Sequence, residues 1–135
     1  MANNNKPIAL IIEDDPDLIR IFARALELSG YQTSTVSDGK EAITMLSGDM
    51  VPDIVILDLH LPGVRGSEIL HTIRADSRFA HTRVILATAD YLLAENLRED
   101  ADMVLLKPIS FSQLRELSSR FISTHDSLQT DAHIP

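Results

Sequence analysis

The sequence predicts an α/β protein built on a doubly wound, five-stranded parallel sheet with helices on both faces. Two observations carry this prediction. Short apolar runs rich in β-branched residues are bounded by polar residues, as is typical of buried parallel strands. Segments of helical periodicity separate these runs, and right-handed crossovers then restrict the topology to a doubly wound sheet. No internal repeat, Gly-rich phosphate loop or Ser-rich linker interrupts the pattern.

The first predicted strand and helix have clear boundaries. The apolar run Ile8–Ile12 predicts a buried strand. Asp15 is suited to the N-cap of the following helix and Pro16 to its first helical position, and Gly30 is a natural helix stop. Apolar residues recur at helical spacing between these limits and give the helix one buried face: Leu18, Ile21, Phe22, Ala25 and Leu26.

The middle of the chain repeats the strand–helix alternation. Residues 33–36 predict the second strand, and the Asp38-Gly39 turn leads into a short helix over residues 40–46. Ile54–Leu57 predicts the third strand. The loop after it is too rich in Pro and Gly for a helix, so Ser67 is the expected cap of the third helix, whose apolar residues are Ile69, Leu70 and Ile73.

The last part of the sheet contains a shortened crossover. Residues 84–87 and Met103–Leu106 predict the fourth and fifth strands, and the segment between them leaves room for only a short fourth helix over residues 92–98. Ser110 begins the fifth helix with the form of a capping box. Its periodic pattern stops near residue 123, so the folded domain is predicted to span 1–123, followed by a disordered tail at 124–135.

Composition limits the classes of function. At 135 residues the chain fits one domain, and the absence of cysteine excludes disulfides and thiolate metal sites. A formal net charge of −8 argues against nucleic acid as a direct partner, because phosphate binding needs a basic face. No signal-peptide region or membrane-length apolar run is present. We therefore expect a cytoplasmic protein without a membrane partner.

Residues able to handle a phosphoryl group follow four of the apolar runs. In an open parallel sheet, ligands bind outside the carboxyl ends of the strands, so these residues are expected at one edge. Two carboxylates about 4 Å apart repel by roughly 4 kcal/mol at an effective dielectric near 20, so the acids require either a bound cation or a retained proton. Oxygen ligands favour a hard ion, and Mg²⁺ fits best. The residues are Glu13, Asp14, Asp58, Thr88 and Lys107.

This combination favours phosphoryl transfer to a carboxylate. An Asp beside a metal ion, a Lys and a Thr can act as nucleophile toward phosphorus, because the cations neutralise the phosphoryl oxygens during transfer. Acids at strand ends are also often helix caps or solvated loop residues, and we interpret Asp15 and Asp17 in that way.

The same residues resemble the receiver domain of two-component response regulators, in particular single-domain receivers of the chemotaxis type. The resemblance runs from Ile8 to about Ile122 in the order of the family and implies its flavodoxin-like fold. Four segments carry it: Ile11-Ile12-Glu13-Asp14-Asp15, Ile56-Leu57-Asp58-Leu59-His60-Leu61-Pro62-Gly63, Leu86-Ala87-Thr88-Ala89 and Leu105-Leu106-Lys107-Pro108.

The resemblance assigns a role to each acid. It makes Asp58 the phosphoacceptor, which also binds the metal ion. Asp14 resembles the direct carboxylate ligand of Mg²⁺, and Glu13 resembles the acid that reaches the ion through water. The backbone carbonyl of His60 would complete the protein ligands.

Further residues would contact the phosphoryl group. By resemblance, the Thr88 hydroxyl, the Ala89 backbone amide and the Lys107 ammonium would each bind a phosphoryl oxygen, and the Lys107–Pro108 peptide would be cis. His60 and Asp90 lie two residues beyond Asp58 and Thr88, where side chains can flank the path of an attacking water. We therefore expect His60 and Asp90 to modulate the lifetime of the phosphoryl group.

Three departures from the family pattern concern the output face. Arg65 stands where many relatives carry an acid, and Val104 stands where many carry a Tyr or Phe that turns inward on activation. The stretch from Thr88 to Lys107 is also shorter than usual. We therefore expect an altered output face and a monomer.

The resemblance implies a stand-alone signalling protein, not an enzyme acting on other substrates. It would accept phosphate from a histidine kinase or phosphotransfer protein and then bind an unidentified downstream protein or continue a phosphorelay. One alternative is a phosphohydrolase with an aspartyl-phosphate intermediate, although such enzymes usually carry an acid at the position of His60. The other is a receiver-like scaffold that is never phosphorylated, which the complete set of site residues argues against.

Overall fold

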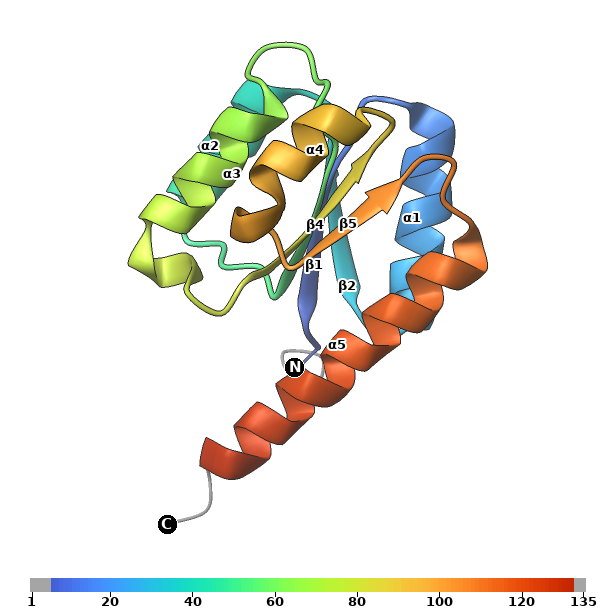
Figure 1. Cartoon of the computed structure of the whole chain (residues 1–135). Coiled ribbons are helices and arrows are strands. Elements are labelled where there is room, and N and C mark those ends of the chain that lie inside the picture. The colour runs from blue at the N-terminus through green and yellow to red at the C-terminus, as the bar shows by residue number, and fades with distance from the viewer. Residues whose placement is uncertain (1–5, 133–135) are drawn as a thin grey trace.

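A single parallel sheet with helices on both faces forms the protein (Figure 1). The computed structural model describes residues 6–132, with side chains through residue 122. The strand order β2-β1-β3-β4-β5 confirms the predicted doubly wound fold. The strands are β1 (Ile8–Ile12), β2 (Gln32–Val36), β3 (Ile54–Leu57), β4 (Arg83–Thr88) and β5 (Met103–Leu106).

The helices divide between the two faces of the sheet. On one face lie α1 (Pro16–Leu28) and α5 (Phe111–Ala132), and on the other lie α2 (Gly39–Ser47), α3 (Gly66–Ala75) and α4 (Tyr91–Leu97). Two short 3₁₀ turns, η2 (Ser77–Phe79) and η3 (Arg98–Asp100), precede β4 and β5. No helix within residues 6–132 combines the length and apolarity needed to cross a membrane.

Each central strand contributes to two cores. In β1, Leu10 and Ile12 pack beneath α2, α3 and α4, while Ala9 and Ile11 pack beneath α1 and α5. Successive strand residues point to opposite faces, so a strand covered on both faces must be apolar at every position. This requirement explains the uninterrupted apolar runs of the sequence.

The predicted caps of α1 and α5 are present, and Asp38 of the predicted Asp38-Gly39 turn caps α2. Asp15 accepts hydrogen bonds from the backbone N–H groups of Asp17 and Leu18, and Asp38 caps α2 in the same way. At the start of α5, the backbone N–H of Gln113 donates to the Ser110 hydroxyl over 3.0 Å. These caps satisfy backbone donors that have no partner within the helix, so they fix the helix starts locally.

The start of α3 differs from the prediction. The helix begins at Gly66, and Arg65 occupies the N-cap position without a side-chain hydrogen bond, so Ser67 is not the cap. The reason is tertiary packing, because the Gly66 N–H donates to the Leu59 carbonyl over 3.2 Å and Gly66 lies against the backbone of Asp58. That contact places the N-cap at Arg65, two residues earlier than the predicted cap at Ser67.

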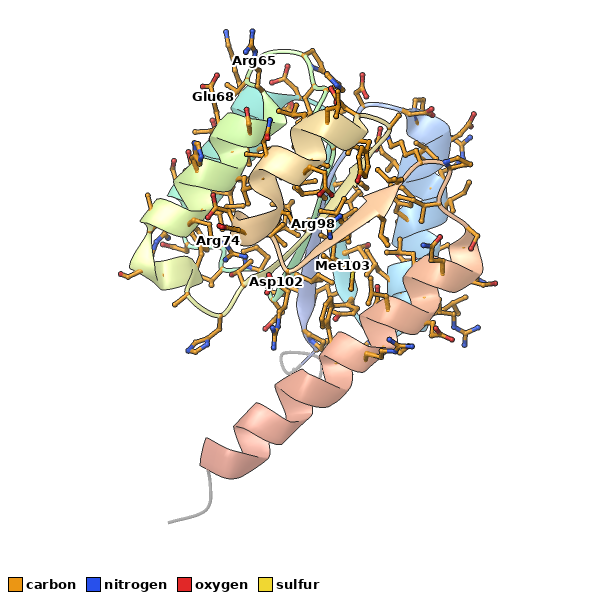
Figure 2. The ribbon with its side chains drawn as sticks, in the orientation of Figure 1. Arg65, Glu68, Arg74, Arg98, Asp102 and Met103 are labelled. Carbon is orange, nitrogen blue, oxygen red and sulfur yellow. The ribbon has the colours of Figure 1, made fainter. Side chains whose placement is uncertain are left out.

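The fourth crossover is short, as predicted. Helix α4 has seven residues and is followed directly by η3. At the end of this crossover Arg74 of α3 donates to the Asp100 carbonyl over 2.7 Å and to the Asp102 carboxylate over 2.9 Å. Asp102 also accepts from the Val84 N–H over 2.7 Å. Figure 2 shows Arg74 and Asp102 near each other, at the end of the sheet away from Arg65.

Helix α5 extends further than the sequence analysis predicted. It continues to Ala132, beyond the expected start of a disordered tail at residue 124, and its last turns project from the domain (Figure 1). No Gly or Pro lies between Phe111 and Ala132, and helical backbone hydrogen bonds are local, so the helix can continue where the apolar pattern has ended. Residues 133–135 of the predicted tail lie outside the described residues, and the domain boundary at 123 stays a prediction.

Candidate functional site

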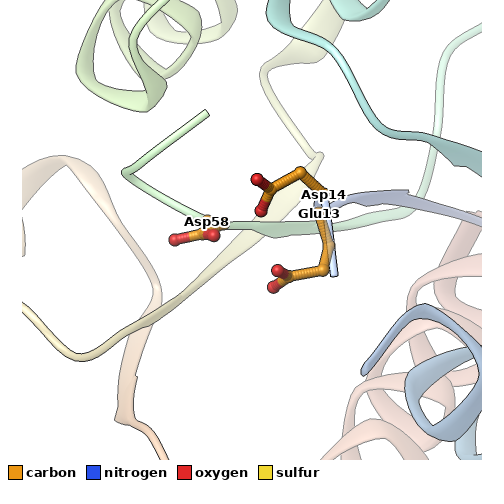
Figure 3. A group of neighbouring side chains, drawn as sticks. All are labelled: Glu13, Asp14 and Asp58. Carbon is orange, nitrogen blue, oxygen red and sulfur yellow. The ribbon is translucent and has the colours of Figure 1, made fainter. Parts of the chain in front are cut away.

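Three carboxylates converge at the carboxyl edge of the sheet (Figure 3). Glu13 and Asp14 follow β1, Asp58 follows β3, and the two strands pair in parallel with Ile12 opposite Leu57. One oxygen from each carboxylate lies within 4.8 Å of the others. The register of the parallel sheet therefore brings together three acids that the sequence places at the ends of separate apolar runs.

Lys107 places one positive charge among these acids. Its Nζ lies 3.0 Å from Glu13 Oε1 and 3.3 Å from Asp58 Oδ2. The Lys107 backbone N–H donates to the Thr88 carbonyl over 2.9 Å, which ties the end of β5 to the end of β4. The Lys107–Pro108 peptide is cis, as the resemblance implied.

Burial, hydrogen bonding and neighbouring charges together shift the pKa values of Glu13 and Lys107. Burial raises the pKa of Glu13, the hydrogen bond from Lys107 lowers it, and the nearby Asp58 charge raises it, so that the pKa lies above its ordinary value. For Lys107, burial lowers the pKa, but the hydrogen bond to Glu13 and the charge of Asp58 outweigh it, so that the ammonium form is favoured.

The donor set fits a hard divalent cation. Glu13 and Asp58 are only 1% and 5% exposed, whereas Asp14 is exposed to solvent. The single Lys107 ammonium is shared by two of the three carboxylates, which leaves the group with an excess of negative charge. Carboxylate oxygens open to solvent on one side suit Mg²⁺, which keeps several of its waters when bound.

The backbone around the site holds Asp58 and Thr88 in place. The Asp58 N–H donates to the Ile12 carbonyl over 3.0 Å, and the His60 N–H donates to Asp58 Oδ1 over 3.2 Å. Thr88 is fully buried, and its hydroxyl oxygen accepts from the Asp90 N–H over 3.1 Å. Ala89 follows Thr88 directly at the same strand end.

His60 and Asp90 contact each other beside the site. His60 Nε2 lies 3.0 Å from Asp90 Oδ2, and Asp90 Oδ1 accepts from the Leu93 N–H at the start of α4. The bond from Leu93, followed by that to His60, holds the pKa of Asp90 below its usual range. Sequence analysis selected both residues but not their contact, because no local signal links side chains 30 positions apart.

A cavity of about 570 Å³ opens beside the acids. Asp14, His60, Arg65 and Leu93 are among the residues that line it. Arg65, one of the departures from the family pattern, therefore contributes a cationic side chain to the lining of this cavity. Of the three acids, Asp14 is the one that lines this cavity.

Comparison with known families supports the interpretation of this edge. A family model described as "Response regulator receiver domain" matches residues 9–118. Among curated proteins, the chain is 33% identical over 123 residues to the sensor histidine kinase TmoS of Ectopseudomonas mendocina, covering 89% of this chain and 12% of TmoS. It is 31% identical over 105 residues to the DNA-binding response regulator MtrA of Mycolicibacterium smegmatis, covering 78% of this chain and 46% of MtrA.

Solved structures with the same fold include isolated receiver domains. The signal receiver domain of a Luxo repressor protein from Vibrio parahaemolyticus superposes with a TM-score of 0.81 at 28% identity, covering 96% of this chain and 99% of that one. The receiver domain of the sensor histidine kinase PA1611 from Pseudomonas aeruginosa has a TM-score of 0.76 at 25% identity, covering 87% and 98%. That structure has a magnesium ion coordinated in its active-site cleft.

Proposed function

The chain belongs to the response regulator receiver family, and from this premise we propose that Asp58 accepts a phosphoryl group from a phosphohistidine donor in a Mg²⁺-dependent reaction. The observation that carries the proposal is the Lys107 ammonium between Glu13 and Asp58, beside Asp14. The Lys107 ammonium, together with a divalent cation held by the acids, would neutralise the charge of an incoming phosphoryl group.

The transfer step is a direct displacement at phosphorus. An Asp58 carboxylate oxygen attacks the phosphorus atom, the new O–P bond forms as the P–N bond of phosphohistidine breaks, and the bonding electron pair leaves with the imidazole nitrogen. Lys107, 3.3 Å from Asp58 in the free protein, pairs with a phosphoryl oxygen as the charge arrives. The Thr88 hydroxyl and the Ala89 amide would bind the other oxygens.

Magnesium would be held by Asp14 and Asp58 directly, with Glu13 acting through water and the His60 carbonyl completing the protein ligands. The ion would neutralise negative charge on the phosphoryl oxygens during transfer. The convergence of three carboxylates within 4.8 Å supports this assignment, because only one ammonium is present to balance them among the described residues.

The function of the whole protein is a further part of the proposal. The chain spans less than half the length of TmoS and MtrA, so DNA binding and kinase activity are properties of those proteins. For this chain we propose a cytoplasmic monomer that receives phosphate from a histidine kinase or phosphotransfer protein. Its net charge of −8 favours a protein over nucleic acid or a membrane as the downstream partner.

Intact-mass measurement tests the phosphorylation chemistry. Incubated with Mg²⁺ and phosphoramidate, the wild type should gain one phosphoryl group, and Asp58→Asn should gain none at that position. Asp14→Ala should lose most of the Mg²⁺-dependent labelling, whereas Asp15→Ala, which removes only the cap of α1, should label normally. Equal labelling of Asp58→Asn and wild type would show that Asp58 is not the acceptor.

His60 and Asp90 should set the lifetime of the phosphoryl group. Their contact places both side chains beside the approach to Asp58, where they can orient or obstruct an attacking water. His60→Ala and Asp90→Ala should therefore each change the rate of autodephosphorylation without abolishing phosphorylation. The decay of labelled protein measures this rate, and unchanged decay in both variants would contradict the assignment.

A further inference from the structure

The carboxylate of Asp90 is bonded on both of its oxygens. Oδ2 lies 3.0 Å from His60 Nε2, and Oδ1 accepts from the Leu93 N–H over 3.0 Å. Asp90 is also the N-cap residue of α4. We call the contact between the two side chains the His60–Asp90 bridge. One side chain therefore touches both a residue at the phosphoacceptor and the first turn of a helix.

Both ends of the bridge are also bonded to the site through their backbones. The His60 N–H donates to Asp58 Oδ1 over 3.2 Å, and the Asp90 N–H donates to the Thr88 hydroxyl oxygen over 3.1 Å. The four residues thus form a chain of hydrogen bonds that runs from the acceptor carboxylate to the buried Thr88. This chain links Asp58 to Asp90 outside the hydrophobic core.

Helix α4 is well placed to respond to such a change. It has only seven residues, so few internal hydrogen bonds hold it, and its cap is a large part of its local stability. Its first turn carries Tyr91 and Leu92, which are 53% and 75% exposed. A small rotation of this turn changes the apolar surface offered to solvent.

The hydrophobic core offers limited means of transmitting a change from the site to the first turn of α4. Val104 of β5 is partly buried against the cluster that includes Ala94 and Leu97 of α4. Val is small and has one strongly preferred rotamer in most backbone settings, so it cannot move a large group between two positions. The bonded route through Asp90 is one direct connection to α4 among the described residues.

We propose that the His60–Asp90 bridge couples the phosphorylation state of Asp58 to the first turn of α4. The proposal rests on the proposed phosphorylation of Asp58. A phosphoryl group adds negative charge and competes with Asp90 for the N–H of the His60 side chain. Asp90 then loses one of its two partners, and its bond to the Leu93 N–H changes with it.

Amide NMR with beryllofluoride and Mg²⁺ as the phosphoryl mimic tests the coupling. In the wild type, the Leu93 amide resonance should shift when the mimic binds. The Arg78 amide serves as an internal control, because it donates to the Asp76 cap of η2 over 2.9 Å, and η2 precedes β4 at the opposite end of that strand from Thr88. In His60→Ala, the Leu93 shift should fall by at least half at saturating mimic, while the Arg78 amide stays unchanged.

His60→Gln provides the matched rescue. Its side-chain N–H can replace the donor to Asp90, so the Leu93 shift should return toward that of the wild type. An undiminished Leu93 shift in His60→Ala, or no shift in the wild type with the mimic bound, would overturn the coupling alone. Failure of the wild type to gain phosphoryl mass and to bind the mimic would overturn the proposed function, and the coupling with it.

Discussion

Gly66→Ala tests how closely α3 is packed against the backbone at Asp58 and Leu59, directly after β3. A Cβ at this position would lie 2.4 Å from the Asp58 carbonyl oxygen and 2.6 Å from Leu59 Cα. Real side chains do not tolerate such contacts, and both neighbours are backbone atoms that cannot rotate away. Either α3 or the segment that carries Asp58 must therefore move.

The size of the effect follows from two opposing terms. Overpacking a core position costs about 1–3 kcal/mol, and a rigid backbone contact belongs at the upper end of that range. Ala stabilises a helix by about 1 kcal/mol relative to Gly, which offsets part of the loss. We expect Gly66→Ala to lower the free energy of unfolding by about 2 kcal/mol.

Gly48→Ala is the matched control. There the new Cβ would lie 3.5 Å from the Met45 carbonyl oxygen, an ordinary contact, and the backbone φ of −85° suits Ala. This variant should be neutral or more stable by up to about 1 kcal/mol. Urea unfolding followed by circular dichroism measures both variants. If the two unfold within about 0.5 kcal/mol of each other, the argument from close packing is refuted.

Two further predictions concern magnesium and pH. Mg²⁺ at 100 times its dissociation constant should raise the free energy of unfolding by about 2.7 kcal/mol in the wild type. A chelator should reverse the gain, and Asp14→Ala should show little of it; an equal gain in that variant would place the ion elsewhere. The bond from the Arg78 N–H, and then the Arg78 side chain, hold the pKa of Asp76 below its ordinary value of 3.8 in the folded protein. This contribution to stability is therefore present above that pH and lost as the pH falls through the folded-state pKa. The unfolding midpoint of the wild type relative to Asp76→Asn should accordingly be higher at neutral pH than near pH 3, and a pH-independent difference would contradict it.

Local chemistry in the sequence determined most of the fold. The apolar runs predicted the central strands because residues buried on both faces of a sheet must be apolar throughout. Asp15 and Ser110 predicted helix starts because a cap bonds to N–H groups only two or three residues ahead. The convergence of Glu13, Asp58 and Lys107 was also predictable, because parallel strands bring their carboxyl ends to one edge.

Only the tertiary structure decided the details that depend on contacts between distant residues. The start of α3 is set by Gly66 against the backbone of Asp58, not by the local cap signal at Ser67. The extent of α5 followed no apolar pattern, because a helix continues through polar residues until something breaks it. The sharing of Lys107 between two acids, and the bridge from His60 to Asp90, depend on distances between separate strand ends. Periodicity indicates which face a side chain occupies, but only the packed structure determines which partner it meets there.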